Sequence, residues 1–118
     1  MVLGTSGEFP SFSVAERKLV TETAMKHKGN MNIMVGPGTP NIVETIDLAK
    51  HAQSVGADGL LVIPPFYFNN PPVEGLTRHY AGLFEAAAVL TDFPERAVDA
   101  LLGVQGRLVQ YPLWRAAA

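Results

Sequence analysis

The fold is decided by the stretch Gly56-Ala57-Asp58-Gly59-Leu60-Leu61-Val62-Ile63-Pro64-Pro65. Its central run, residues 59–63, is apolar without polar alternation, which is typical of a strand buried on both faces of a parallel sheet. Gly56 favours the end of a preceding helix, and the strand ends near Pro65. The stretch therefore predicts one helix-to-strand junction of an α/β protein.

The same pattern recurs along the chain. Further strands are predicted at residues 1–3 and 32–35, which are also short apolar runs. The three strand ends, near Ser6, Gly36 and Pro65, are about 30 residues apart, the length of one βα unit. The repeat predicts α/β architecture with right-handed crossovers.

Three helices are predicted around these strands. Ser13 and Glu16 have the spacing of a capping box for a first helix, which runs to about residue 27 before a left-handed stop at Gly29. A second helix, with Pro40 at its first position, runs to about residue 55, and a third covers about residues 73–87. The expected inward stripe of the second helix is Ile42, Ile46, Ala49, Ala52 and Val55.

Composition limits the class of protein. The 118 residues make one domain at most, and 47% hydrophobic residues is typical of a globular chain. A net charge of −2 leaves no basic stripe for nucleic acid, and no apolar run is long enough to span a bilayer. The N-terminus has no signal-peptide pattern, and the lack of cysteine suits a reducing compartment. We therefore expect a soluble, cytoplasmic protein without nucleic-acid or membrane partners.

Two segments carry candidate chemistry. Gly4-Thr5-Ser6-Gly7-Glu8 places two hydroxyls between glycines, where successive backbone N–H groups can cradle a carboxylate or phosphate. The alternative is a strand-to-helix loop that binds nothing, its hydroxyls capping the following turn. Pro64-Pro65-Phe66-Tyr67-Phe68 places a phenol at a strand end two βα units later.

Together these segments resemble the pyruvate-dependent class I aldolase family, which includes dihydrodipicolinate synthase, N-acetylneuraminate lyase and 2-keto-3-deoxygluconate aldolase. Residues 4–8 match the family's Gly-(Ser/Thr)-(Ser/Thr)-Gly-Glu turn, and residues 56–59 match its Gly-Ala-Asp-Gly strand start. Residues 65–67 match its Pro-aromatic-Tyr strand end, and residues 74–80 match its Glu-Gly-Leu-x-x-His-(Phe/Tyr) helix. The motifs follow the family order.

The resemblance implies a partial (β/α)8 TIM barrel of about three to four βα units, because a whole barrel needs about 250 residues. Residues 1–88 would form the units of barrel strands two to four, with the chain opening inside the second strand. Residues 89–118 depart from the family pattern and are expected to form a divergent helical tail. We therefore expect a fragment, arising by truncation, internal deletion or a change of reading frame.

The resemblance also assigns roles to side chains. Thr5 and Ser6 would hold the carboxylate of a 2-oxo acid, together with the backbone N–H groups of Ser6 and Gly7. Tyr67 would shuttle a proton during Schiff-base formation and carbon–carbon bond cleavage, and Ser6 would relay a proton toward it. For Tyr67 the alternative is an ordinary aromatic residue packed under a loop.

Other polar residues carry weaker signals. Glu8 is equally explained as a first-turn carboxylate at a helix N-terminus, and Pro37 argues against a direct ligand role for the loop after the second strand. His27, His51 and His79 are scattered over helices without a spaced carboxylate. No metal site and no cofactor are expected.

The family's electrophile is a Schiff base on a lysine of the sixth barrel strand, and the resemblance finds no counterpart for it here. The chain's lysines fall on predicted outer helices or their ends: Lys18, Lys26, Lys28 and Lys50. An arginine cannot take the role, because it does not deprotonate to a nucleophilic amine.

Three hypotheses follow for the function. The first is a truncated lyase or aldolase for pyruvate or another 2-oxo acid and an aldehyde, inactive by itself. The second is a non-catalytic carboxylate-binding module. The third is a half-barrel that completes itself as a homo-oligomer, because an incomplete barrel leaves strand edges open.

Overall fold

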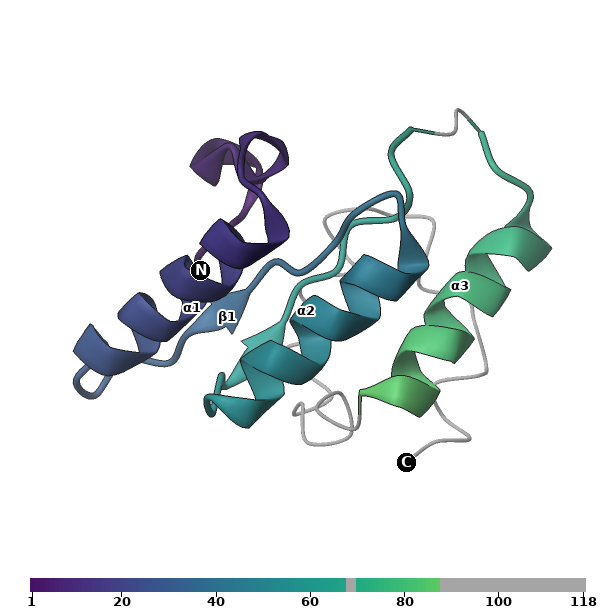
Figure 1. The fold of residues 1–118 in the computed structure, drawn as a ribbon. Coiled ribbons are helices and arrows are strands. Elements are labelled where there is room, and N and C mark those ends of the chain that lie inside the picture. The colour runs from purple at the N-terminus through teal and green to yellow at the C-terminus, as the bar shows by residue number, and fades with distance from the viewer. Residues whose placement is uncertain (68–69, 88–118) are drawn as a thin grey trace.

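The computed structural model describes residues 1–67 and 70–87. Its three α-helices lie side by side in chain order, and the loops that follow the strands gather at the upper end of the molecule (Figure 1). Among these described residues, no helix combines the length and apolar character needed to cross a membrane. The expected tail at residues 89–118 lies outside them.

A small parallel sheet forms the centre of the described fold. Strands β1 (Met34–Val35) and β2 (Gly59–Leu60) pair in parallel, and Val2 forms a parallel bridge to Val35. The sheet order therefore follows the chain order, from residue 2 to β1 to β2. This order confirms the predicted α/β class and is the arrangement that successive βα units produce.

The strands are shorter than the sequence predicts. The run at residues 1–3 forms a single bridge because Leu3 leaves the extended region, with φ at 57°. Residues 32–33 and 61–63 lie outside the regular strands, although the Leu61 N–H still donates to the Val35 carbonyl at 2.9 Å. The regular ladder is therefore only two residue pairs long.

Helix α1 (Val14–His27) begins as predicted. The Ser13 backbone N–H donates to Glu16 Oε2 at 2.8 Å, and the Glu16 N–H donates to Ser13 Oγ at 3.3 Å. This reciprocal pair is the capping box. Beyond the helix, Gly29 has φ at +56°, so the predicted left-handed stop is also confirmed.

Helix α2 (Ile42–Ser54) begins two residues later than predicted. Asn41, rather than the residue before Pro40, is the N-cap, and its Oδ1 accepts from the Val43 N–H at 3.0 Å. The asparagine amide decides the boundary because it satisfies an N–H group that has no partner within the helix. Helix α3 (Val73–Ala86) agrees with its prediction.

The buried face of α2 differs from the expected stripe. Its fully buried members are Thr45, Leu48, Ala49 and Ala52, whereas Ile42, Ile46 and Val55 are half-buried. The reason is that α2 packs beside α1 on one flank and α3 on the other. A helix with two neighbours buries a wider arc than a single stripe predicts.

The core lies between the sheet and the helices. Its buried members are Leu3, Phe9, Ile33, Val35, Ala49, Ala52, Leu60, Leu83 and Ala87. Tyr80 of α3 packs against this core and donates its hydroxyl to the Val62 carbonyl at 3.2 Å, and burial raises its pKa to about 12. All three described helices therefore share one core with the sheet.

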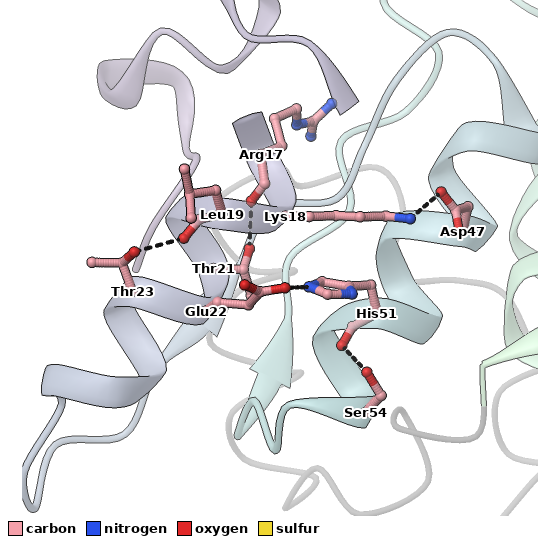
Figure 2. Close-up of polar contacts among 9 residues, drawn as sticks. All are labelled: Arg17, Lys18, Leu19, Thr21, Glu22, Thr23, Asp47, His51 and Ser54. Carbon is pink, nitrogen blue, oxygen red and sulfur yellow. Dashed lines mark hydrogen bonds and ion pairs between the residues drawn. The ribbon is translucent and has the colours of Figure 1, made fainter. Parts of the chain in front are cut away.

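One ion pair and one histidine–carboxylate contact join α1 to α2 at the surface (Figure 2). Lys18 Nζ lies 2.8 Å from Asp47 Oδ2, and His51 Nε2 lies 3.1 Å from Glu22 Oε1. Both carboxylates are about half exposed. Such pairs are worth at most about 1 kcal/mol each, so burial rather than charge holds the two helices together.

Asp58 of the Gly-Ala-Asp-Gly motif has a structural role. Its Oδ2 accepts from the Ile33 backbone N–H at 2.8 Å and from Lys28 Nζ at 2.8 Å. The carboxylate thus joins the end of α1 and the approach to β1 to the start of β2. It lies at the end of the strands opposite the candidate site.

We expect the chain to lose stability in acid. Hydrogen bonds from Ser13 lower the pKa of Glu16 below 4.5, and those from Lys28 and Ile33 lower the pKa of Asp58 below 3.8. Because the folded pKa values are depressed, this stabilisation is present above the ordinary values and is lost as pH falls through the folded ones. Urea midpoints should therefore drop as pH falls below about 4.5.

The Asp58→Asn variant tests whether the Asp58 carboxylate contributes to this loss of stability in acid. It should have a lower urea midpoint at neutral pH and a shallower loss of stability in acid than the unaltered chain. Glu85→Gln on the exposed face of α3 removes the same charge and is the control. An acid profile unchanged by Asp58→Asn would contradict this explanation.

Candidate functional site

The candidate site is the end of the sheet where the strands finish. Residues 4–8, 36–39 and 63–67 follow the three extended segments and lie at this same end (Figure 1). In parallel α/β proteins, ligands bind at the carboxyl ends of the strands. Both sequence-predicted segments are therefore at the end where binding is expected.

The Thr5–Gly7 segment forms a single 3-10 turn, η1. Its Gly7 N–H donates to the Gly4 carbonyl at 2.9 Å, and the Glu8 N–H donates to the Thr5 carbonyl at 3.2 Å. The Gly7 N–H, which we expected to meet a ligand, thus serves the turn and would have to be shared with one.

The hydroxyls of Thr5 and Ser6, unlike the Gly7 N–H, are not used within the turn. Thr5 and Ser6 are exposed, and across the part of the chain that the structure describes neither side chain has a hydrogen-bond partner. The alternative in which they cap the following turn is therefore not what the geometry shows. Both hydroxyls are available to an incoming carboxylate.

Two residues with positive φ flank the turn. Leu3 has φ at 57° and Glu8 has φ at 51°, in the left-handed region that side chains other than glycine rarely adopt. Glu8 joins η1 to a second 3-10 turn, η2 (Phe9–Ser11), and is not a first-turn carboxylate of α1. Residues in such conformations concentrate at ligand-binding sites, where the surrounding structure holds them.

The loop after β1 is packed between its two neighbours. A Cβ on Gly36 would collide with the Leu3 backbone carbonyl, and a Cβ on Gly38 would lie 2.6 Å from Ile63 Cγ2 and 3.1 Å from the Ile63 backbone. Pro37 between them is fully buried. The glycines on either side of it allow this close approach of the backbones.

We predict that Gly36→Ala lowers the free energy of unfolding by about 1–3 kcal/mol, because the new methyl group meets backbone rather than a movable side chain. Gly82→Ala in α3 is the matched control: no heavy atom lies within 4 Å of its Cβ position. That variant should gain about 0.5–1 kcal/mol from helix propensity. Equal effects in urea unfolding would contradict the close approach at Gly36.

Tyr67 follows β2 on an exposed turn, with 78% of its surface accessible. Its neighbour Phe66 meets Phe9 edge to face, with ring centroids 5.6 Å apart. This contact joins the segment that carries Tyr67 to the segment that follows Ser6. The proton relay between Ser6 and Tyr67 stays a prediction.

A pocket of about 420 Å³ lies beside the hydroxyl turn. Thr5, Ser6 and Gly7 line one side of it, and Phe12 and Val20 contribute apolar groups. Tyr67 does not line this pocket. The hydroxyls therefore border an apolar hollow on the flank of residues 1–3.

The histidines lie on helices, as predicted. The His27 Nδ1 lies 2.9 Å from the Thr23 carbonyl in the last turn of α1. His51 faces Glu22 across the surface between α1 and α2, and burial lowers the pKa of His79 in α3. None of the three is at the candidate site.

Arg17 is the residue that sequence reasoning missed. It lies in α1 but is only 3% exposed, and its Nη2 donates to the Gly36 carbonyl at 2.7 Å and the Gly38 carbonyl at 3.1 Å. Its guanidinium carbon is 5.2 Å from the centre of the Phe9 ring. A charged residue on a helix is normally solvated, so no sequence signal distinguishes it from Lys18.

The chain is similar to known proteins over most of its length. The model of the Dihydrodipicolinate synthetase family matches residues 1–113. A 4-hydroxy-tetrahydrodipicolinate synthase of Acidiphilium cryptum (strain JF-5) is 38% identical over 115 residues, which are 93% of this chain and 39% of that protein. The chain thus spans about two fifths of that relative.

Solved structures agree. YagE, a prophage protein of the dihydrodipicolinic acid synthase family from E. coli K12 in complex with pyruvate, matches with a TM-score of 0.70 and 34% identity over 75% of this chain and 30% of that one. A catalytic lysine mutant of Ruminococcus gnavus sialic acid aldolase matches with a TM-score of 0.68 and 33% identity over 74% of this chain and 28% of that one. The chain belongs to the dihydrodipicolinate synthetase family.

Proposed function

We propose that this chain provides the carboxylate-binding and proton-relay part of a lyase that acts on pyruvate or another 2-oxo acid, with an aldehyde as the second reactant. The observation that carries the proposal is the exposed, unbonded pair of hydroxyls on Thr5 and Ser6, at the same end of the sheet as Tyr67. Family membership supports it, as does the pyruvate bound to the related YagE.

In the proposed mechanism, the Thr5 and Ser6 hydroxyls donate hydrogen bonds to the substrate carboxylate. The hydrogen bonds to the carboxylate are charge-assisted and therefore stronger than neutral ones. Tyr67 moves a proton to and from the reacting carbon–oxygen centre, with Ser6 as the relay. Tyr67 and Ser6 are the proposed catalytic residues, and Thr5, Ser6 and Gly7 the proposed substrate-binding residues.

We further propose that this chain alone forms no Schiff base. Lys18 and Lys28 are held by Asp47 and Asp58, and Lys26 and Lys50 are exposed on helices. None lies among the loops at the carboxyl ends of the strands. The amine that condenses with the ketone, as the catalytic lysine does in family lyases, would have to come from another part of the protein.

An NMR titration of the 15N-labelled chain with pyruvate tests the binding half of this proposal. Pyruvate should shift the amides of residues 5–7 in a saturable way, and Thr5→Val with Ser6→Ala should weaken the affinity about tenfold or more, as expected for the loss of charge-assisted hydrogen bonds. Lys50→Gln is a control for charge on a distant helix. A double variant that binds as well as the unaltered chain would contradict the proposed site.

Borohydride trapping tests the chemical half. The chain, incubated with pyruvate and borohydride and then analysed by mass spectrometry, should carry no reduced adduct. An adduct on any of its four lysines would contradict the proposal that the electrophile lies elsewhere.

The second candidate function is that of a half-barrel that associates with itself, as three to four βα units of a TIM barrel would. The pocket beside residues 1–3 and the exposure of Met1 (63%) and Phe12 (39%) favour it, because they form an apolar surface along a sheet edge. We propose a cytoplasmic homo-oligomer. Sedimentation should show a species larger than one chain, and a stable monomer would exclude this candidate.

A further inference from the structure

A buried arginine lies at the junction of the three segments that form the candidate site. Arg17 is only 3% exposed, and its guanidinium donates to the carbonyls of Gly36 and Gly38 in the loop after β1. Two charge-assisted hydrogen bonds to backbone carbonyls satisfy part of its donor capacity. The loop after β1 is thus tied to α1 by one side chain.

The same guanidinium also contacts the segment after the hydroxyl turn and, through it, reaches the turn that carries Tyr67. It lies against the Phe9 ring, 5.2 Å from the ring centre, immediately after the hydroxyl turn. Phe9 in turn meets Phe66, the neighbour of Tyr67, at 5.6 Å. A continuous set of contacts therefore runs from the loop after β1, through Arg17 and Phe9, to the turn that carries the phenol.

Ion pairing does not explain this placement. Desolvation lowers the pKa of Arg17, while Glu44 acts on it from a distance and raises it. Among the residues that the structure describes, no carboxylate lies within ion-pair distance of Arg17, and its Nε is buried without a partner. Burying a guanidinium without a carboxylate partner costs desolvation free energy, and the contacts that it makes in exchange join three loops.

We propose that Arg17 is a positioning residue, which holds the hydroxyl turn, the Gly36–Gly38 loop and the Tyr67 turn in the arrangement that binds a 2-oxo acid. This inference rests on the proposed function. Figure 2 shows that the Arg17 side chain leaves α1 in a different direction from that of Lys18, which points to Asp47 of α2. Lys18 is therefore the matched control, with the same charge, the same helix and no contact at the site.

The test compares Arg17→Met with Lys18→Met at a temperature where circular dichroism shows both to be folded. In NMR titrations, Arg17→Met should weaken pyruvate binding about tenfold, and Lys18→Met should change it less than twofold. A tenfold effect is within the usual range for the coupling of a binding site to a residue outside it. Arg17→Lys keeps the charge but not the planar face against Phe9, so it should bind with intermediate affinity. A purely structural role would lower the stability of the two Arg17 variants without producing this order of affinities.

The amides of Gly36, Gly38 and Phe66 give a second readout that needs no ligand. In Arg17→Met their hydrogen exchange should accelerate, while in Lys18→Met it should not. Unchanged exchange, or unchanged pyruvate affinity in Arg17→Met, would overturn the inference. If the unaltered chain binds no pyruvate, the proposed function fails, but the exchange data still decide whether Arg17 orders the loops. If Arg17→Met does not fold, Arg17→Lys supplies both the affinity and the exchange measurements.

Discussion

Leu83→Ala should lower the free energy of unfolding by about 2–5 kcal/mol. Leu83 is fully buried, and it is part of the core cluster that contains Val35 and Leu60. Removing its isobutyl group loses the transfer free energy of the deleted atoms and leaves a cavity that the neighbouring helices fill only in part. Domains of this size have total stabilities of about 5–15 kcal/mol, so the loss would be a large fraction of the whole.

Leu19→Ala is the control for Leu83. Leu19 has the same side chain in a helix but is 61% exposed on α1, so its replacement should change stability by about 0.5 kcal/mol or less. Urea unfolding followed by circular dichroism measures both. A small effect at Leu83 would mean that α3 does not share the core with the sheet and the other helices.

Phe9→Ala should also lower the free energy of unfolding strongly, by about 3–5 kcal/mol. Phe9 is 6% exposed, and its ring contacts both the Arg17 guanidinium and the Phe66 ring. The deletion removes apolar burial and also leaves the guanidinium without its aromatic neighbour. Phe9→Leu should recover part of the stability, because it refills most of the volume without the ring face.

Phe12→Ala is the control for Phe9. Phe12 is three residues away and 39% exposed, in a segment of similar composition. Its replacement should cost clearly less in the same urea experiment, since much of its surface already meets solvent. Equal costs at the two positions would show that the packing under the hydroxyl turn is not what we describe.

Local interactions made the helices predictable from sequence. The capping box of Ser13 and Glu16 and the left-handed glycines at 29 and 56 occur where expected, because each depends on residues a few positions apart. The start of α2 was missed by two residues, since the Asn41 side chain competed with Pro40 for the boundary. The start of a helix is decided by the side chain that satisfies its free N–H groups.

The candidate site was predictable only in part. Short motifs located the Thr5–Ser6 turn and Tyr67, and the chain repeat placed both at the carboxyl ends of strands. The use of the Gly7 N–H inside its own turn, the exposure of Tyr67 and the role of Glu8 as a link between two turns depend on backbone geometry. Sequence patterns carry no information on these hydrogen bonds.

The sequence by itself determined the α/β alternation, the helix boundaries to within two residues and the family, because periodicity, caps and short motifs are local properties of the chain. Only the tertiary structure decided that Arg17 is buried against Gly36, Gly38 and Phe9, and that Asp58 joins α1 to β1 rather than serving the site. The physical reason is that a charged side chain such as Arg17 is stable out of water only where distant backbone groups supply its partners. The backbone partners are 19 and 21 residues from Arg17, and that of the exposed Asp58 is 25 residues away, separations that only the folded chain brings within hydrogen-bond distance.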